Sequence, residues 1–234
     1  MSKRLSIFLM LVLLAFSAVG LYAQDEVELI LEDGLNDYDG TRDNTIFNES
    51  NATNGGGDHI FAGITAQRTE RRALVAFDIS DVPEGATITS VTLQLVVSRT
   101  RQGGGDTEVS MHRLTKDWGE GMQHADNQEG AGAASVPGDA TWRENRRNES
   151  SWDNPGGDFV EEASAMATTG NSGREVLFES DGLVADVQAW VNGEADNFGW
   201  IFIGDGTAKR FHASDDDSQE EGKRPRLTIG YTTN

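Results

Sequence analysis

Residues 88–97, ITSVTLQLVV, decide the fold class of this chain. From Val91 to Val97, apolar residues occupy every second position, and Thr92 and Gln94 stand between them. Successive side chains of a β-strand point to opposite faces, so this alternation places one row of side chains in a core and a mixed row toward solvent. The stretch therefore predicts a half-buried antiparallel strand.

Similar short apolar runs recur along the chain, separated by clusters of glycine, asparagine and aspartate. The other clear candidates for strands are residues 27–31, 73–79, 108–114, 175–178, 200–203 and 226–231. Residues 181–193, DGLVADVQAWVNG, carry the one helical pattern, with Gly193 as a stop and with these residues on one face: Leu183, Val184, Val187, Trp190 and Val191. This arrangement predicts an all-β fold, a two-sheet antiparallel β-sandwich of the jelly-roll type with one short helix.

The first 23 residues have the features of a secretory signal peptide. Lys3 and Arg4 precede an apolar run from Ile7 to Phe16, and small residues then lead to Ala23. The run is too short for a membrane span, and no second hydrophobic segment follows it. We expect an exported protein without membrane insertion, located outside the cell, at its surface or in the periplasm, with residues 24–234 forming a single domain.

Charge and cysteine content narrow the classes of partner. The chain has a formal net charge of −20, and removal of the leader makes it two units more negative. Such a charge repels nucleic acid and anionic lipid, and it favours solubility or cation binding. The absence of cysteine excludes disulfides and thiolate metal sites.

Residues 139–159, DATWRENRRNESSWDNPGGDF, combine tryptophan and arginine in a stretch without regular periodicity. Tryptophan faces pack on sugar rings, and arginine forks pair with uronate or sulfate groups. The candidate ligand-binding residues are Trp142, Arg143, Arg146, Arg147 and Trp152. Two alternatives remain open: the indoles close the end of the sandwich, which is the commoner place for a large aromatic side chain, and the arginines pair with Glu144 and Glu149.

Two acidic stretches are candidates for a structural calcium site. Asp37, Asp39 and Asp43 surround Gly40, and such oxygen ligands around a tight turn are typical of extracellular calcium loops. Residues 213–221, ASDDDSQEE, form the second stretch, with Asp215, Asp216 and Asp217 in a row. The alternative is a solvated acidic loop, which is the usual place of a charge run.

No catalytic residue is predicted. A GxSxG elbow is absent, and the histidines at positions 59, 112, 124 and 212 show neither HExxH nor another metal-binding spacing. The glycine-rich NGGGD at 54–58 lacks the lysine of a phosphate loop and predicts a turn. Arg71 and Arg72 introduce RRALVAFDIS, which predicts chiefly a core strand, with a clamp for uronate as the alternative.

Several stretches resemble the DNRLRE-domain proteins, a family related to alginate-binding carbohydrate modules and to repeats of archaeal disaggregatases. They are RRALVAFDISDVPEGATITSVTLQLVV, LTKDWGEG, DATW followed by SWDNPGGDF, DVQAWVNGEADNFGWIFIG and RPRLTIGY. The resemblance implies a jelly-roll domain on an exported protein, non-catalytic, and a polysaccharide as its partner, uronate-rich polymers included. The alternative is a structural component of a cell-surface or extracellular matrix assembly, bridged by calcium, because so acidic a chain repels polyanionic glycans unless a local basic patch overcomes the field.

Overall fold

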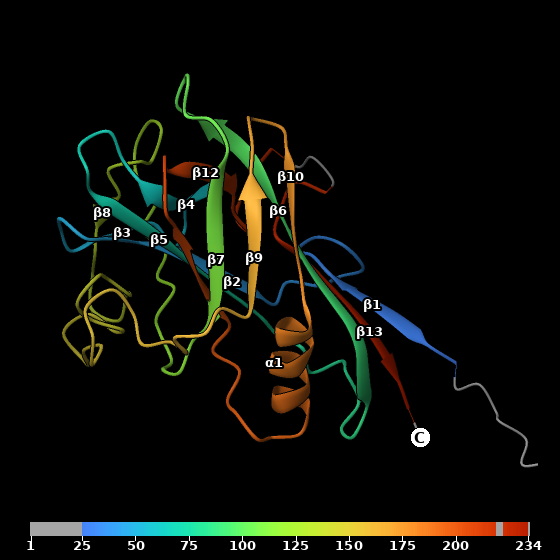
Figure 1. Cartoon of the computed structure of the whole chain (residues 1–234). Helices are drawn as coiled ribbons and strands as arrows, with labels where there is room; N and C mark the ends of the chain where they lie inside the picture. The colour runs from blue at the N-terminus through green and yellow to red at the C-terminus, as the bar shows by residue number, and fades with distance from the viewer. Residues whose placement is uncertain (1–24, 219–221, 234) are drawn as a thin grey trace, which may run out of the picture.

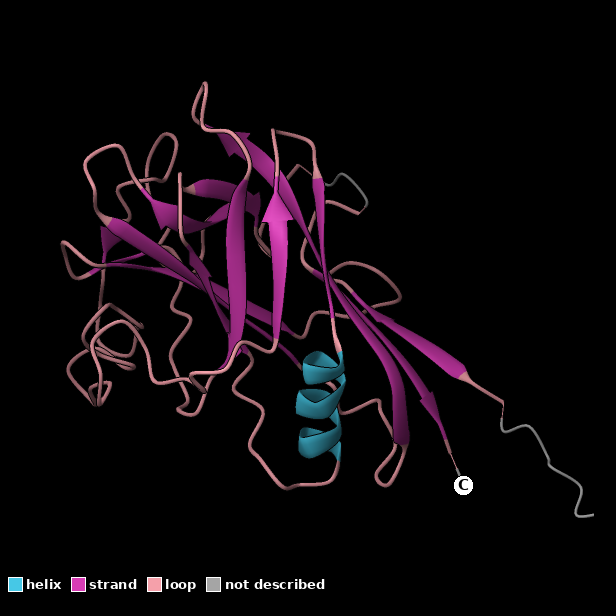
Figure 2. Cartoon of the chain, viewed as in Figure 1, coloured by secondary structure: helices cyan, strands magenta, loops and turns pink. Residues whose placement is uncertain are grey.

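The computed structural model describes residues 25–218 and 222–233, so the predicted leader lies outside the described residues. Strands dominate the described chain, and one helix lies beside them (Figures 1 and 2). The strands are β1 (Val27–Leu31), β2 (Thr41–Phe47), β3 (Ala52–Thr53), β4 (His59–Ile64), β5 (Glu70–Phe77), β6 (Thr87–Thr100), β7 (Thr107–Arg113), β8 (Ala133–Ala134), β9 (Ala165–Thr169), β10 (Glu175–Glu179), β11 (Trp200–Gly204), β12 (Lys209–His212) and β13 (Arg226–Thr232), and the helix is α1 (Asp181–Val191). Within the described residues, no helix is long and apolar enough to cross a membrane.

The strands form two layers that are joined along one side. One layer contains β1, β13, β6 and β10, and the other contains β2, β5, β11, β7 and β9 in that order. β12 pairs with both β6 and β4, and β4 pairs with β5, so these strands connect the layers into one curled antiparallel sheet. The predicted all-β sandwich is confirmed.

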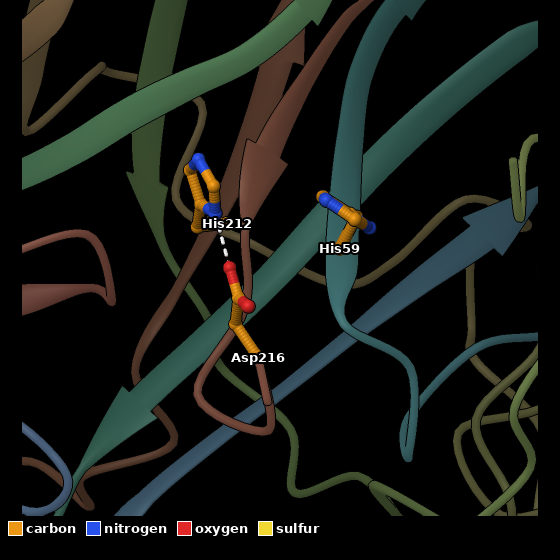
Figure 3. A group of neighbouring side chains, drawn as sticks. All are labelled: His59, His212 and Asp216. Atoms are coloured by element: carbon orange, nitrogen blue, oxygen red, sulfur yellow. Dashed lines mark hydrogen bonds and ion pairs between the residues drawn. The ribbon is translucent and has the colours of Figure 1, made fainter. Parts of the chain in front are cut away.

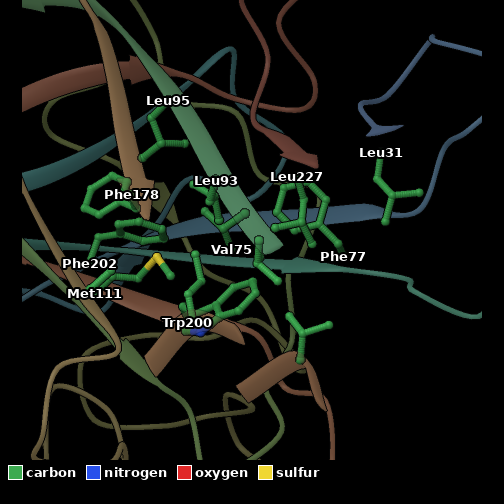
Figure 4. Close-up of a cluster of buried hydrophobic side chains, with 14 of the residues drawn as sticks. Leu31, Val75, Phe77, Leu93, Leu95, Met111, Phe178, Trp200, Phe202 and Leu227 are labelled. Atoms are coloured by element: carbon green, nitrogen blue, oxygen red, sulfur yellow. The ribbon is translucent and has the colours of Figure 1, made fainter. Parts of the chain in front are cut away.

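The inner core fills the space between the layers. Residues 91, 93, 95 and 97 of β6 are all buried, as their alternation predicts, and they meet Val75 and Phe77 of β5 from the opposite layer (Figure 4). Burial of each large apolar side chain stabilises the fold by about 1.5–3 kcal/mol. This interior is the main source of stability in a chain without disulfides.

An outer core lies on the opposite face of the β5 layer. Leu74 and Ala76 of β5 join Ile201 of β11 there, beneath the long connections between β7 and β9. Both faces of β5 are therefore buried. The RRALVAFDIS stretch is a core strand, as predicted, and its two alternating sets of side chains enter two different cores.

The predicted helix is confirmed over residues 181–191. The hydroxyl of Ser180 accepts a hydrogen bond from the Leu183 amide at 3.0 Å, which caps the free amides of the first turn. Leu183, Val187 and Trp190 are buried, and the Trp190 ring lies 4.6 Å, centroid to centroid, from Trp200. The helix covers one end of the inner core (Figure 1).

Several short strands were not predicted. Thr41–Phe47 forms β2 where the sequence predicted a calcium loop ending at Asp43, and β4 and β12 also escaped prediction. These strands lack a long apolar alternation, and pairing with β5 and β6 fixes them. NGGGD is a turn, as predicted, and β8 lies within the long connection between β7 and β9.

Candidate functional site

The tryptophans of residues 139–159 belong to the outer core. Trp152 is only 4% exposed, and its indole Nε1 donates a hydrogen bond to the Thr141 carbonyl oxygen at 2.8 Å. Neither face of this indole is free for a ligand, so the prediction of Trp152 as a ligand contact is wrong and the packing alternative holds.

Trp142 is partly buried at the edge of the same core. The Arg72 guanidinium lies over its ring, 4.7 Å from the centroid, and a side chain at Gly156 would come within 2.9 Å of the indole. The ring is therefore enclosed between a cation and a close turn, in contrast to an open sugar platform.

The arginines of this stretch differ in their partners. Arg146 donates to the Asp117 carboxylate at 2.5 Å, and Arg147 lies 4.0 Å from the Glu144 carboxylate, as its predicted pairing requires. Arg143 is exposed, and its guanidinium has no hydrogen-bond or ion-pair partner within residues 25–218 and 222–233. One free guanidinium remains where the sequence predicted a basic cluster.

A cleft of about 390 Å³ opens on the outward face of β4, β12 and β6. It is lined by Phe61, Ile64, Thr65, Ala66, Arg71, Arg99, Thr100, Arg101, Gln102, Gln128, Gly130, Thr207, Ala208 and Arg210. We call it the arginine cleft.

Strand pairing builds the floor of the arginine cleft. Arg210 of β12 is paired with Phe61 of β4 on one side and with Arg99 of β6 on the other. Directly paired residues of antiparallel strands project from the same face. The next residues, Ile60 and Phe211, enter the inner core, so the row of Phe61, Arg210 and Arg99 points outward.

The arginines of the cleft have amide and hydroxyl partners. The Gln128 side-chain oxygen accepts hydrogen bonds from Arg99 and, at 3.1 Å, from Arg210, whose Nε donates to Ser98 Oγ at 2.9 Å. In the described part of the chain, no carboxylate forms an ion pair with Arg99, Arg101 or Arg210. Burial, together with the charge of Arg99, lowers the pKa of the Arg210 guanidinium.

Arg71 has a different place at the side of the cleft. Its guanidinium makes two hydrogen bonds to the Glu49 carboxylate, at 2.6 and 2.5 Å, and lies 4.6 Å from the Phe47 ring centroid. Because the Glu49 carboxylate neutralises its charge, Arg71 serves as one wall of the cleft and leaves anion binding to the other arginines. The guanidinium groups of Arg99, Arg101 and Arg210 can form two parallel hydrogen bonds with a carboxylate or sulfate, beside the aromatic ring of Phe61.

Sequence reasoning missed the cleft, although one signal points to it. Arg99 and Arg101 stand two positions apart in VSRTRQ, at the end of the strand with the clearest alternation. Residues two positions apart on a strand project from the same face. The contribution of β12 has no comparable signal, because Arg210 is separated from Arg99 by more than a hundred residues.

The two predicted acidic stretches meet beneath β2. Asp43 is fully buried, and its Oδ2 accepts a hydrogen bond from the Ser214 amide at 2.5 Å, while Oδ1 has no partner. Glu120 accepts from the Asp43 amide at 2.9 Å. Burial raises the pKa of Asp43 and Asp215, and it raises the pKa of Glu120 to about 7.

The predicted set of Asp37, Asp39 and Asp43 is not assembled. Asp37 and Asp39 are exposed on the loop before β2, and within the described residues they belong to no group of three side chains with ligand atoms close enough to share an ion. Asp43 faces Glu120 and Asp215 because it lies inside a strand, and its side chain is directed by the strand's pleat.

Comparison with known proteins supports carbohydrate binding. Residues 37–146 match the sequence profile of carbohydrate-binding module family 96, a stretch that spans a little under half of the chain. The matched stretch includes Phe61, Arg99 and Arg101 of the arginine cleft. No curated protein matches the chain. The chain is thus similar to a family of non-catalytic carbohydrate-binding modules, and the narrower resemblance to DNRLRE-domain proteins stays a prediction.

Proposed function

We propose that this protein is a non-catalytic module that binds acidic polysaccharide in the arginine cleft. The observation that carries the proposal is the set of Arg99, Arg101 and Arg210, which line one concave surface and have no carboxylate partner among the described residues. The similarity to a carbohydrate-binding module family supports the class of ligand.

The electrostatics favour a carboxylated or sulfated sugar over a neutral one. The chain as a whole is acidic, with a net charge of −20, so a group of arginines without carboxylate partners in the described residues is unusual on it. A local cluster of positive charge can hold an anion although the overall field is repulsive, because salt screens distant charges beyond about 8 Å at physiological ionic strength. Uronate residues present a carboxylate on each ring, which suits a row of guanidinium groups.

The same proposal places the protein outside the cell, as a secreted or surface-retained module. The positively charged and apolar segments of residues 1–23 support export. A soluble module that meets polysaccharide at a surface needs no active site of its own.

The proposal is tested by affinity electrophoresis of the folded protein in gels that contain polyuronate, sulfated or neutral polysaccharide. We expect retardation by the acidic polymers, and loss of it when Arg99, Arg101 and Arg210 are replaced by alanine. The matched control replaces Arg143, Arg146 and Arg147 by alanine and should leave retardation intact. Equal loss in both variants, or retardation by neutral polymers alone, contradicts the proposal, and no retardation by any polymer favours the matrix alternative.

We also propose a structural calcium ion at Asp43, with Glu120 and Asp215 as ligands that move closer on binding, because within the described residues these three carboxylates do not form a group with ligand atoms within 4.8 Å of one another. The observation that favours it is the buried Oδ1 of Asp43, which has no hydrogen-bond partner among the described residues. An isolated buried carboxylate is destabilising, whereas Ca²⁺ binds six to eight oxygen ligands and would neutralise this cluster.

Thermal unfolding tests the calcium proposal. The protein, first stripped with chelator, should unfold at a higher temperature when calcium is restored, and Asp43→Asn should remove this increase. Asp37→Asn and Asp39→Asn are matched controls and should retain it. An unchanged unfolding temperature of the wild type on addition of calcium contradicts the proposal.

A further inference from the structure

A cluster of histidine and carboxylate side chains lies beside the arginine cleft. His59 of β4 is paired in register with His212 of β12, and their ring centroids are 5.6 Å apart (Figure 3). Asp216 follows in the turn after β12 and is hydrogen-bonded to His212 Nδ1. One ligand atom from each of the three side chains lies within 4.8 Å of the others.

The cluster is well ordered by its surroundings. Asp216 is 5% exposed, its Oδ1 accepts from the Ser218 amide at 2.8 Å, and its carbonyl accepts from Arg224 at 2.7 Å. The side chains of His59 and His212 are 14% and 17% exposed, so solvent reaches the rings without surrounding them. A small ion can enter from the outward face, and few side chains need to be ordered to receive it.

Glu129 orients His59. Its carboxylate lies 2.7 Å from His59 Nδ1, and it also accepts from the His59 amide at 3.0 Å and from Asn54 Nδ2 at 2.9 Å. With Nδ1 held in this way, Nε2 is the nitrogen of His59 that is left for a metal. A carboxylate behind a ligating histidine is the usual support of a protein metal site, since it fixes the ring and raises its basicity.

The position of Glu129 is strained and closely packed. Its backbone φ is 62°, in the left-handed region that residues other than glycine rarely adopt. A Cβ at Gly57 would lie 2.7 Å from its carboxylate, so the glycine-rich turn makes room for it.

We propose that His59, His212 and Asp216 bind a divalent transition metal ion of the zinc class, with Glu129 as the residue that positions His59. Two imidazole nitrogens and one carboxylate oxygen are a donor set that Zn²⁺ uses, with a fourth position left for water or another ligand. The ion takes the place of the hydrogen bond between His212 and Asp216.

The geometry is close to what zinc needs. Ligand atoms of a tetrahedral zinc site lie about 3.3 Å apart, given bonds of about 2 Å. The separations are at most 4.8 Å, so zinc binding requires the ligand atoms to move by about 1.5 Å or less. Imidazole nitrogen favours zinc, nickel or copper over calcium and magnesium, which prefer oxygen ligands, so this site is chemically distinct from the calcium cluster around Asp43.

A neighbouring set of side chains offers a poorer site. Asp58 and His124 lie 3.9 Å apart beside Glu129, but the His124 side chain is 50% exposed and Glu129 is already committed to His59. The metal proposal does not depend on glycan binding, because His59 and His212 lie on a different row of paired residues from Phe61 and Arg210.

The test begins with protein stripped of metal and titrated with Zn²⁺ against a chromophoric chelator. We expect one equivalent to bind, and excess Ca²⁺ not to displace it. His59→Gln and His212→Gln should each abolish this binding. Glu129→Gln should weaken it about 10- to 100-fold, the usual effect of removing a carboxylate behind a metal-bound histidine.

The matched control is His112→Gln. His112 lies outside the cluster, where its ring contacts the Val160 carbonyl and the Ser110 hydroxyl, so its replacement should leave zinc binding unchanged. NMR of the wild-type histidine rings adds a readout that needs no variant: the His59 and His212 signals should move on addition of zinc, and the His112 signal should not.

Absence of zinc binding by the stripped wild type overturns the proposal. So does binding that survives both His59→Gln and His212→Gln, or binding that only His124→Gln removes. The glycan proposal is judged separately, because its assays use a different ligand and a different set of variants.

Discussion

Two outward faces of this sandwich carry arginine next to aromatic side chains, and these side chains have a different role on each face. The outer face of the β5 layer is covered by the connection that contains Trp118, Trp142 and Trp152, and arginine cations stack on the first two rings at 4.8 and 4.7 Å. The outward face of β4, β12 and β6 is open, and its guanidinium groups line a cleft with Phe61. Arginine next to an aromatic ring occurs on both.

The difference lies in what neutralises the arginines. On the covered face, Arg42 and Arg146 share the Asp117 carboxylate, and their hydrogen bonds are used up in packing. On the open face, Arg99 and Arg210 share the neutral side chain of Gln128. A charge that is paired within the protein is committed to that contact, whereas an unpaired one is available to a ligand. The partner of an arginine, more than its presence, therefore marks a binding surface.

Trp152→Ala should give the largest effect and would break the covered face alone. Removal of a buried tryptophan destabilises a core by about 3–5 kcal/mol. The affinity of the molecules that remain folded for polyuronate should be unchanged. Chemical denaturation and calorimetric titration below the unfolding transition measure the two quantities. A stable variant that has lost its glycan affinity would place the ligand on the covered face.

The next largest expected effect is a dependence of folding stability on pH, which comes from the buried carboxylates around Asp43. The pKa of Glu120 is raised from 4.5 to about 7. Between these values the unfolded chain has released a proton that the folded chain retains, so in calcium-free buffer stability should fall as pH rises from about 4.5 to about 7. The loss is at most about 3 kcal/mol.

Glu120→Gln should flatten this dependence, because glutamine does not titrate. Denaturant midpoints at a series of pH values, measured with chelator, give the comparison with the wild type. A decline of equal slope in Glu120→Gln would assign the dependence to other groups.

Arg101→Ala removes one charge from the arginine cleft and so tests how much a single arginine of the open face contributes to polyuronate affinity. Arg101 is exposed, so its removal should leave the unfolding temperature unchanged. One charge-assisted hydrogen bond contributes about 1.5–3 kcal/mol, which corresponds to roughly a 10-fold or greater loss of affinity for polyuronate. Calorimetric titration at low and high salt should show the difference between variant and wild type shrinking as salt screens the charge. An affinity equal to that of the wild type at low salt contradicts the assignment.

Arg143→Ala should have the smallest effect. Arg143 is exposed like Arg101, and its guanidinium is equally free of partners in the described residues, but it lies outside the arginine cleft. Its affinity for polyuronate should stay within about 2-fold of the wild type, since an isolated exposed charge contributes little. A loss as large as that of Arg101→Ala would extend the binding surface to the 139–159 segment.

The interior of the fold could be predicted from sequence, because the alternation of apolar residues in a long strand indicates which face is buried. β1 and β6 were found in this way, and the capped helix α1 by its own period. The packing role of Trp152 was also among the predicted alternatives, since a large aromatic residue in an all-β chain is commonly buried.

The outward face could not be predicted, for two physical reasons. β4 and β12 are short. β12, KRFH, has a single apolar residue, and β4, HIFAGI, is a brief apolar run without polar residues in alternation. The residues they bring together also lie far apart in the chain, so the pairing of His59 with His212 follows from strand register, which linear spacing does not contain. Asp43 shows the same limit, because its partners depend on its being in a strand.

The central claim is that acidic polysaccharide binds on the open face, and NMR of the arginine side-chain and backbone amides during titration with a defined uronate oligosaccharide tests it most directly. The account predicts that the signals of Phe61, Arg99, Arg101, Gln128 and Arg210 move together and saturate, while those of Trp142 and Arg143 stay in place. Movement confined to the 139–159 segment, with the cleft signals unchanged, would contradict it.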